Sequence, residues 1–468
     1  MTRKEKIQLL LLFCIVLLSR LPFLFAGYGT EEDSWGIVRA VMRTTELGSY
    51  EPSRLPGHPV AESIYLLFPH GNYFAYNFVS ALFSAIAVLF FALSLRVLGS
   101  KRCLLLSYTL AFIPVFYISS TYTIDYCISL AFVMMSFYAL LKDSAGLCGL
   151  LLGLATGCRV TSLVFLLPFS ILFYYRTKSF LHYPRLLLSA LFFSAISYIP
   201  VILKFGGSFF TYYDQFGYPP LPKVVYKASV GVFGALGLIA LIYAFVILLK
   251  NKLAKKGISN YESAIPDKIV LASATPIVLF ILAYLKLPQK SAYLIPALPF
   301  ILILLSVYLD EKKLRWICFL LMLSPFAFGI NLSDDKRGST PSSLAVSFNV
   351  SGQEICFDVI KGPLWADVSK RKQKMNYVDH VIEYCKKNEE DRIVISGWWY
   401  NEIEVTLHRE NLVDMENDFV FYINREQMER YRADGYELYY LPEQERYNDE
   451  YSGMKYTTQV AKPFEPAR

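Results

Sequence analysis

Three consecutive carboxylates, Glu31, Glu32 and Asp33, stand in the segment GYGTEEDSWG at residues 27–36, where the first long apolar run ends. Acids in the first turn of a helix stabilise its dipole by about 0.3–1 kcal/mol each, and one or two would serve that purpose. A run of three acids favours a second role. A positioned carboxylate can act as a general base that takes a proton from a hydroxyl group.

A second group of polar residues follows in SRLPGHPVAESIYLLFP, at residues 53–69. Two prolines bracket a Gly-His pair, and because proline fixes φ they predict a stiff loop that holds Arg54 and His58 in place. Glu62 comes next, on a short helix that is expected to continue to Phe68. Each residue alone is typical of a solvated loop. Together with the three acids, they indicate a polar site at the mouth of a helix bundle.

Further charges interrupt apolar runs later in the chain. Arg159 breaks GLLLGLATGCRVTSLVFLLP, Lys290 stands in KLPQKSAYLIP, and Asp125 lies in SSTYTIDYCISL. A charged residue within a membrane segment is costly and is a functional candidate by default. The alternatives are a loop cation at Arg159, a snorkelling lysine at Lys290 and a helix cap at Asp125. Cations of this kind can hold a phosphate as negative charge develops on it.

The elements that must position these residues are apolar. The 468 residues are 54% hydrophobic and 18% charged, with a mean hydropathy of +0.37, which is too apolar for an ordinary soluble protein. Runs of about 20 apolar residues indicate membrane-spanning helices. Eleven are predicted, at 7–26, 74–95, 104–120, 126–141, 145–158, 160–175, 186–204, 228–249, 269–286, 291–308 and 314–331.

Charge divides the chain into a membrane part, residues 1–331, and a tail. The membrane part holds 28 Lys and Arg against 14 Asp and Glu, and residues 332–468 hold 18 against 25. With a cytoplasmic N-terminus, 18 of the 28 basic residues fall in cytoplasmic segments, as the positive-inside rule requires. An odd number of spans then places the acidic tail outside, in the same compartment as the three acids.

The first outer loop is predicted at residues 27–73. Thr30 followed by Asp33 fits a helix capping box. Trp35, Val38 and Met42 then form an apolar face at helical spacing. The pattern predicts an amphipathic helix that lies on the membrane surface.

The tail is predicted to begin with a linker, residues 332–350, and to continue as a water-soluble α/β domain at 351–468. Its strands and helices alternate, which indicates a small, mostly parallel sheet of three strands. Trp398, Trp399 and Tyr400 follow a predicted strand directly. They can stack on a sugar, although aromatic residues at such a position more often pack in the core.

The order of these motifs resembles the GT-C superfamily of polytopic membrane glycosyltransferases, which includes protein O-mannosyltransferases and aminoarabinose transferases. In that superfamily an acidic pair and an aromatic residue open the first outer loop, and a segment similar to Pro-Gly-x-Pro precedes the second span. Here Glu32-Asp33-Ser34-Trp35 and RLPGHP, residues 54–59, match. The resemblance covers residues 1–331. Glu32-Asp33 reverses the common Asp-Glu order. Asp33 aligns with the first acid of the superfamily's motif when it is read as Asp-Ser, so Asp33 is the first candidate for the base and Glu32 the second.

The resemblance implies an inverting transfer of a sugar from a polyprenyl-phosphate donor to an acceptor hydroxyl on a glycan, lipid or protein, outside the plasma (inner) membrane. It implies no cofactor beyond that donor and no nucleic-acid partner, and it leaves a divalent metal open. The expected roles are a catalytic base at Asp33 or Glu32, donor phosphate binding by Arg159, Lys290, Arg54 and His58, and substrate orientation by Glu62, Asp125 and Tyr293.

Two other functions and one non-catalytic role remain open from the sequence. One is a transporter or flippase for a lipid-linked saccharide, although such proteins tend to have internal repeats and broken helices near the membrane midplane. The other is a saccharide ligase that uses a diphosphate-linked donor. A non-catalytic assembly subunit would tolerate changes at the outer-loop acids.

Overall fold

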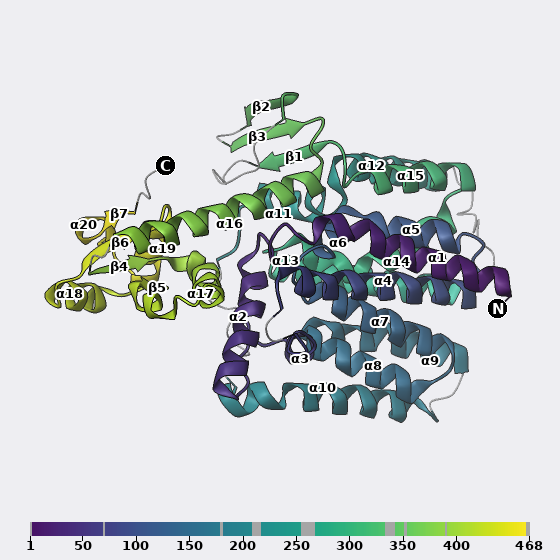
Figure 1. The fold of residues 1–468 in the computed structure, drawn as a ribbon. Helices are drawn as coiled ribbons and strands as arrows, with labels where there is room; N and C mark the ends of the chain where they lie inside the picture. The colour runs from purple at the N-terminus through teal and green to yellow at the C-terminus, as the bar shows by residue number, and fades with distance from the viewer. Residues whose placement is uncertain are drawn as a thin grey trace.

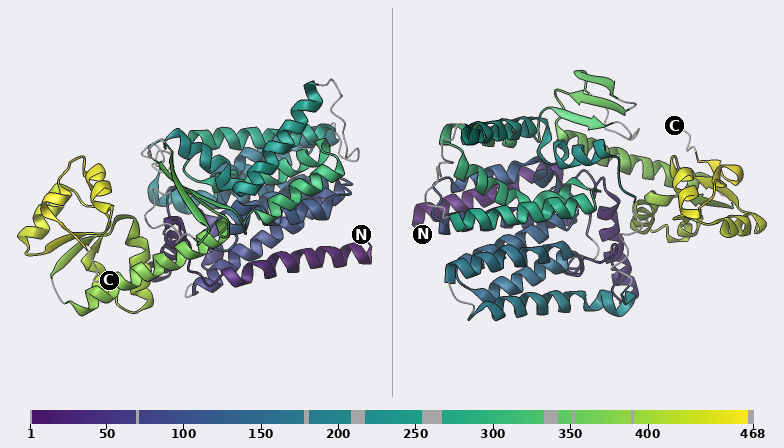
Figure 2. Two further views of the ribbon diagram at one scale, coloured as in Figure 1. Left: turned by 90° about the horizontal axis from the view of Figure 1, so that it is seen from above. Right: turned by 180° about the vertical axis from the view of Figure 1, so that it is seen from behind.

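The computed structural model describes residues 2–68, 71–177, 181–207, 217–253, 267–332, 342–350, 353–388 and 391–464. It has two parts, a bundle of long helices and a smaller α/β part at one end of that bundle (Figure 1). The N-terminus lies at the opposite end of the bundle (Figure 2). The predicted fold class, a polytopic helix bundle followed by a small α/β domain, is therefore confirmed.

The helices of the bundle match the predicted apolar runs closely, because each run is long enough for several turns and holds few polar groups. They are α1 (Arg3–Arg20), α4 (Tyr73–Val97), α5 (Cys103–Phe112), α6 (Pro114–Ser119), α7 (Tyr126–Leu141), α8 (Ala145–Cys158), α9 (Leu166–Thr177), α10 (Tyr183–Phe205), α11 (Leu221–Ala228), α12 (Val230–Leu253), α13 (Asp267–Lys286), α14 (Leu298–Tyr308) and α15 (Glu311–Leu323). Short 3-10 turns, η1 (Leu21–Phe23), η2 (Val160–Phe165) and η5 (Ser291–Ala297), follow α1 and precede α9 and α14.

Two predicted spans differ from the structure. The third, 104–120, is broken between α5 and α6, because Pro114 cannot donate the backbone hydrogen bond that a continuous helix needs. The eleventh, 314–331, ends early, since α15 stops at Leu323 and a strand begins at Gly329. Among the described residues, seven helical segments are long and apolar enough to cross a membrane, and three apolar helices are shorter. The number of eleven crossings stays a prediction.

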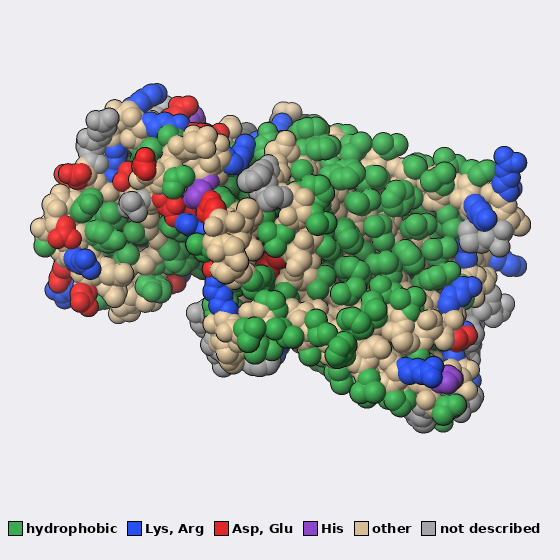
Figure 3. Space-filling model, turned by 60° about the horizontal axis from the view of Figure 1, so that its bottom comes forward, with side chains coloured by type: hydrophobic (Ala, Val, Ile, Leu, Met, Phe, Trp, Pro, Cys, Tyr) green, Lys and Arg blue, Asp and Glu red, His purple; other side chains and the backbone are tan. Residues whose placement is uncertain are grey.

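The surface of the bundle is apolar. Leu203 is 82% exposed and Leu188 is 65% exposed, and similar side chains cover the outer helices. Figure 3 shows hydrophobic side chains over most of the visible bundle, with Lys and Arg at the end away from the α/β part. Such an area in contact with water would be unfavourable, so it indicates a surface that faces lipid. The chain is an integral, multi-pass membrane protein.

Helix α2 (Glu32–Leu47) crosses the end of the bundle next to the α/β part (Figure 1). Its N-cap residue is Glu31, and the Oγ1 atom of Thr30 donates a hydrogen bond to Asp367 at 3.3 Å. The predicted capping box is therefore wrong, because the hydroxyl group of Thr30 is hydrogen-bonded to Asp367 of the tail and does not cap α2. The apolar face that includes Trp35 and Val38 is buried within the protein and does not lie on a membrane surface.

The short helix α3 (Pro59–Tyr65) follows α2 and packs against it and against α8. It ends at Tyr65, three residues before the predicted end at Phe68. The apolar residues after it, Leu67 and Phe68, are exposed.

The tail contains two sheets. Strands β1 (Gly329–Leu332), β2 (Ala345–Val350) and β3 (Gln353–Asp358) form an antiparallel sheet in the order β1-β3-β2. The predicted linker 332–350 thus contains strand β2, and its residues 333–341 lie outside the described residues. The division into domains at 331 and 351 stays a prediction.

The second sheet is parallel and four-stranded, in the order β5-β4-β6-β7. The three predicted strands are confirmed, and the two-residue strand β7 extends the sheet. Its elements are α16 (Pro363–Lys387), β4 (Arg392–Ile395), η6 (Gly397–Trp399), α17 (Tyr400–Arg409), η7 (Val413–Asp418), β5 (Phe419–Val420), α18 (Arg425–Ala433), β6 (Glu437–Tyr440), α19 (Gln444–Ser452), α20 (Thr457–Val460) and β7 (Lys462–Pro463).

The tail is joined to the bundle by charged side chains that are buried or partly buried. Arg371 of α16 is fully buried, and its guanidinium group donates to the backbone oxygen of Thr121 at 2.9 Å and pairs with Asp367 at 2.9 Å. On α17, Glu404 accepts hydrogen bonds from Arg39 at 2.5 Å and from Arg43 at 2.6 Å. These contacts hold α17 against α2, so the first outer loop and the acidic tail meet at one end of the bundle.

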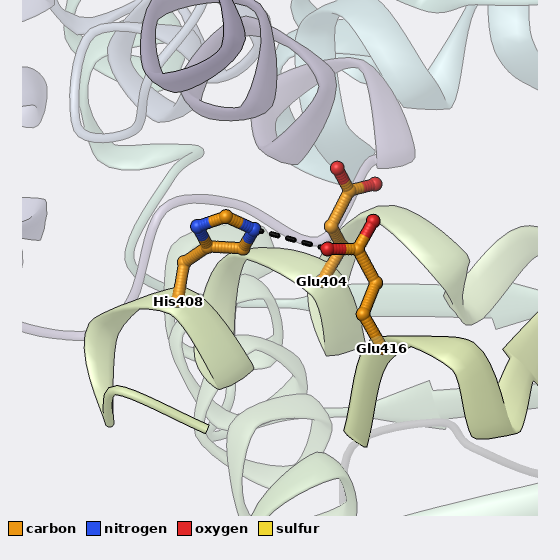
Figure 4. Close-up of side chains that lie close together, drawn as sticks. All are labelled: Glu404, His408 and Glu416. Atoms are coloured by element: carbon orange, nitrogen blue, oxygen red, sulfur yellow. Dashed lines mark hydrogen bonds and ion pairs between the residues drawn. The ribbon is translucent and has the colours of Figure 1, made fainter. Parts of the chain in front are cut away.

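Glu404, His408 and Glu416 are a group with metal-ligand geometry among the described residues, and their ligand atoms lie within 4.8 Å of one another. Figure 4 shows the His408 ring turned toward Glu416, at 3.2 Å. However, Arg39 and Arg43 already neutralise the carboxylate of Glu404, and Arg43 also pairs with Glu416. The group therefore acts as an ion-pair network between the two parts.

Glu404→Ala should loosen the tail without unfolding the bundle. A broken buried ion pair costs about 3–5 kcal/mol, and the partial exposure of Arg39 and Arg43 lowers the expected loss to about 1–2 kcal/mol. Limited proteolysis should then cleave the tail faster. Glu410→Ala is the control: Glu410 directly follows α17 and forms an exposed ion pair with Lys386 of α16, so its loss should leave the cleavage rate unchanged. Equal rates for the two variants would show that the network does not hold the tail.

Candidate active site

Asp125 lies at the centre of the predicted polar site, directly before α7, and its side chain is fully buried. It accepts hydrogen bonds from Arg54 at 2.9 Å and from Arg159 at 2.6 Å, and His58 Nδ1 lies 3.3 Å from the same carboxylate. Burial raises the pKa of Asp125, but the neighbouring Arg159, His58 and Arg54 outweigh this effect and hold the pKa well below its usual range. Asp125 therefore stays ionised and holds two arginines in place.

Asp33 lies in the first turn of α2 and shares the cations of the site. Arg54 Nε lies 3.3 Å from its carboxylate, and Lys290 forms a short ion pair with it. Lys290 also pairs with Glu31 at 2.8 Å. The result is an alternating row of charges, Lys290, Asp33, Arg54, Asp125 and Arg159, which we call the charge row.

The charge row sets the protonation of Asp33. Burial raises the pKa of this carboxyl group, and the neighbouring Arg54 and Lys290 lower it by more, so that it is held at about 2. Opposite charges at this distance favour the ionised form. Asp33 is thus a carboxylate throughout the physiological range.

Arg159 is fixed by aromatic rings as well as by Asp125. Its guanidinium group lies 4.2 Å from the centre of the Tyr126 ring and 5.3 Å from that of Tyr293. A cation held over aromatic faces gains stability from their quadrupoles. Tyr293 was predicted from the sequence, whereas Tyr126 was not, although it directly follows Asp125.

Glu62 has a supporting position. It is 2% exposed and accepts hydrogen bonds from the backbone of Ser53 at 2.8 Å, from the Ser53 hydroxyl at 2.5 Å and from the backbone of His58 at 3.3 Å. Tyr50 donates a further short bond to it. Glu62 therefore closes the loop that carries Arg54. His58 is also buried, and its Nδ1 atom lies 2.7 Å from the backbone oxygen of Cys158, so it joins this loop to the end of α8.

A cavity of about 720 Å³ opens beside the charge row and is walled by both parts of the molecule. Asp33, Arg54 and Lys290 face it from the bundle, and Trp398 faces it from the tail with 37% of its side chain exposed. We call it the first cavity. Its lining residues are Glu31, Glu32, Asp33, Arg39, Ser53, Arg54, Gln289, Lys290, Tyr293, Trp398, Tyr400, Asn401 and Phe421.

Glu32 differs from its neighbour in charge state. It faces the tail, where the side-chain amide of Asn401 donates a hydrogen bond to it at 3.2 Å. Burial first, and then the carboxylates of Glu402 and Asp33, raise the pKa of Glu32 to about 8. Two adjacent carboxyl groups whose pKa values are pushed apart are typical of an acid and a base that act together.

Sequence reasoning found only some of the residues that the tail brings to the first cavity. Trp398 and Tyr400 were noted as able to stack on a sugar, and both line the wall. Nothing in the sequence indicated that Asn401 and Phe421 belong to the site, because their position there depends on how the tail folds over the bundle. Glu31, the first acid of the run, was noted in the sequence but was assigned no role.

Solved structures share this architecture. ArnT from Cupriavidus metallidurans bound to undecaprenyl phosphate matches with a TM-score of 0.53 and 11% sequence identity, over 99% of this chain and 90% of that chain. Apo ArnT from the same organism gives a TM-score of 0.49 at 10% identity, over 97% and 88% of the two chains. An Archaeoglobus fulgidus oligosaccharyltransferase tethered with an acceptor peptide gives 0.44 at 12% identity, over 86% and 63%. No family model matches the sequence, and no curated protein does so significantly.

The first of these likenesses defines the fold, since the other two have TM-scores below 0.5. The molecule is a polytopic membrane helix bundle with an α/β tail over one end. More particularly, it has the fold of ArnT, which confirms the fold that the resemblance seen in the sequence implies. At 11% sequence identity the likeness establishes the fold alone, because one fold can carry many different chemistries.

Proposed function

We propose that this chain is an inverting membrane glycosyltransferase that moves a sugar from a polyprenyl-phosphate donor to an acceptor hydroxyl group. The observation that carries the proposal is the charge row, which places the carboxylate of Asp33 between the two cations Arg54 and Lys290 at the wall of the first cavity. A base and a phosphate site are thus adjacent, as such a transfer requires. The same fold in ArnT, solved with undecaprenyl phosphate bound, supports a lipid-phosphate donor.

Arg54 and Lys290 are the proposed donor phosphate ligands that face the cavity. Both are cations with N–H donors, which bind an anion more strongly as its charge grows. Arg159 is held behind them by Asp125, Tyr126 and Tyr293 and adds positive potential to the site. His58 and Glu62 position the loop of Arg54 from behind.

In the proposed reaction, Asp33 accepts the proton of the acceptor hydroxyl. The acceptor oxygen forms a bond to the anomeric carbon of the sugar while the bond from that carbon to the phosphate oxygen breaks. The electron pair of the broken bond stays on the lipid phosphate, and attack from the opposite face inverts the configuration. A bound phosphate would draw Arg54 and Lys290 toward itself, which raises the pKa of Asp33 and makes it a stronger base.

Glu32 is the proposed partner on the acceptor side. Its pKa of about 8 leaves it largely protonated at neutral pH, and it lies between the catalytic carboxylate and Asn401 of the tail. A protonated carboxyl group can donate a hydrogen bond to the acceptor. Glu32 is also the alternative base.

The proposed location is the plasma (inner) membrane, with a cytoplasmic N-terminus and the site on the outer side. Figure 3 supports this orientation, because Lys and Arg gather at the bundle end away from the tail. Basic residues favour the cytoplasmic side. The acceptor is a glycan, a lipid or a protein with a free hydroxyl group.

Transfer of a radiolabelled sugar from polyprenyl-monophosphate donors in membranes that hold the protein tests the function. Label in an acceptor fraction, lost when Asp33 is changed, is the expected result. Transfer from diphosphate-linked donors alone would replace the proposal with a ligase. Movement of the lipid-linked sugar across the membrane without transfer would replace it with a transporter.

Lys290→Gln should raise the donor KM by about 10–100-fold, because one charged hydrogen bond to the phosphate, worth about 1.5–3 kcal/mol, is lost. Asp33 also loses a cation, so its pKa should rise and the acid limb of the pH profile should move to higher pH. Lys286→Gln, at the exposed end of α13, is the control. An unchanged donor KM in Lys290→Gln would remove this residue from the phosphate site.

A further inference from the structure

A second cavity, of about 750 Å³, adjoins the first and shares Glu32 and Trp398 with it. It lies between α11, α16 and the segment that carries Trp398. The carboxyl group of Glu32 and the indole ring of Trp398 therefore lie between a ligand in the second cavity and Asp33, the candidate base. Its lining residues are Thr30, Glu32, Lys223, Tyr226, Lys227, Asn331, Lys370, Gln373, Lys374, Tyr377, Trp398, Trp399, Pro442, Glu443 and Tyr447.

Four lysines face this second cavity. Lys223 and Lys227 lie one turn apart on α11, and Lys370 and Lys374 lie one turn apart on α16. Like charges at i and i+4 destabilise a helix, and here the arrangement occurs on both walls. All four side chains are only partly exposed, so each gives up some hydration. Such a concentration of positive charge is stabilised when an anion binds.

Two of the lysines are already oriented by the protein. The ammonium group of Lys374 donates to the backbone oxygen of Thr30 at 3.2 Å and forms a short ion pair with the buried Glu402. Lys227 donates to the backbone oxygen of Gln289 at 2.5 Å, and Gln289 itself lines the first cavity. Burial, and then the charge of Lys223, lower the pKa of Lys227. The lysines are thus partly desolvated and close to the proposed reaction site.

Aromatic rings complete the second cavity. Tyr226, Tyr377 and Tyr447 line it beside Trp398 and Trp399, and Lys374 lies 5.1 Å from the centre of the Trp399 ring. Flat apolar faces with a few charged groups suit a ligand that has both C–H faces and anionic substituents. A saccharide that carries phosphate or carboxylate groups has this combination.

We propose that the second cavity binds an anionic saccharide, which is the acceptor of the reaction. The lysines hold its negative groups, the aromatic rings hold its sugar faces, and a hydroxyl group passes between Glu32 and Trp398 to Asp33. The role as acceptor rests on the proposed transferase function, whereas the binding itself does not. The anionic groups are phosphates or carboxylates, and the test separates these two sources.

The experiment is a binding titration of the purified full chain in nanodiscs of uncharged phosphatidylcholine. The probes are trehalose 6-phosphate, cellobiouronic acid, uncharged trehalose and inorganic phosphate. We expect one or both anionic sugars to bind at least about tenfold more tightly than trehalose and than phosphate, since each lysine contact to an anion contributes about that factor. The stronger of the two anionic sugars identifies the anionic group.

Variants locate the binding. Lys223→Gln combined with Lys370→Gln should weaken the anionic sugar at least about tenfold, because it removes one charge from each wall. Lys372→Gln, an exposed lysine on α16, is the matched control and should change binding less than about twofold. Lys290→Gln distinguishes binding in the first cavity from binding in the second. Lys290 lines only the first cavity, so this variant should still bind the probe. Melting temperatures in the same nanodiscs show that each variant is folded.

The proposal is overturned if the folded double variant binds as wild type, if trehalose binds equally well, or if Lys290→Gln rather than the lysine pair abolishes binding. Phosphate that binds as tightly as the sugar phosphate would overturn the saccharide part. Asp33→Asn should bind the probe unchanged. If the wild-type protein binds the probe but transfers no sugar from any donor, the result counts against the transferase function and in favour of the anion site.

Discussion

Asp33→Asn should abolish sugar transfer, with a fall in kcat of about 10²–10⁴-fold, the usual contribution of a general base. The amide has nearly the same shape as the carboxylate but cannot take up the proton of the acceptor. Lys290 and Arg54 lose an anionic partner in this variant and are then free to bind the donor phosphate. Donor KM should therefore be unchanged or lower, which distinguishes a lost base from a lost binding site.

Single-turnover transfer by purified protein measures this effect. Glu31→Gln is a matched control, because Glu31 lies in the same acidic run and pairs with the same lysine, Lys290. We expect it to retain most of the activity. Full activity in Asp33→Asn together with none in Glu32→Gln would move the role of base to Glu32.

The pH dependence of kcat/KM tests the same assignment independently. With its pKa held at about 2, Asp33 is ionised throughout the range from about pH 4 to 7, so the profile should be flat there. Glu32, with a pKa of about 8, loses its proton above that pH, and a protonated hydrogen-bond donor would be lost with it. Transfer should then decline above about pH 8, and Glu32→Gln should remove the decline. A rise in kcat/KM up to pH 8 would instead identify Glu32 as the base.

Hydrophobic patterning predicted the bundle because a lipid-facing helix needs a long apolar run, and such a run is visible without tertiary information. The run at 74–95 became α4, Tyr73–Val97. The sequence also identified three charged candidate residues, Asp125, Arg159 and Lys290, because each of them interrupts an apolar run. The structure brings them together with Arg54 and Asp33 in one row.

Partners of individual side chains could not be predicted, because they depend on contacts between distant segments. Thr30 fits a capping box by its spacing, yet its hydroxyl group bonds to Asp367 of the tail. The spacing of apolar residues around Arg39 predicts only an amphipathic surface helix, yet Arg39 pairs with Glu404 of the tail. The lysines of the second cavity lie on α11 and α16, and nothing in either segment alone indicates that they face each other.

Asp125→Ala should be the most destabilising single change in the site, and it should also remove donor binding. The side chain is fully buried, and its loss leaves Arg54 and Arg159, only 13% and 12% exposed, without their common carboxylate. Removing one partner of a buried ion pair costs about 3–5 kcal/mol, because an uncompensated charge stays behind. The two arginines should also shift, since Asp125 fixes both of them.

Thermal unfolding in detergent and donor KM measure these two effects. Asp143→Ala is the control, because Asp143 pairs with Arg176 where both side chains are more exposed, and we expect a loss of at most about 1 kcal/mol there. Asp125→Asn keeps one hydrogen-bond acceptor and should fall between the two. If Asp125→Ala unfolds no earlier than Asp143→Ala, the carboxylate does not anchor the cations. A raised donor KM in a fully stable Asp125→Asn would then have to come from lost charge alone, because Arg159 would still be held by the rings of Tyr126 and Tyr293 and Arg54 by the carboxylate of Asp33.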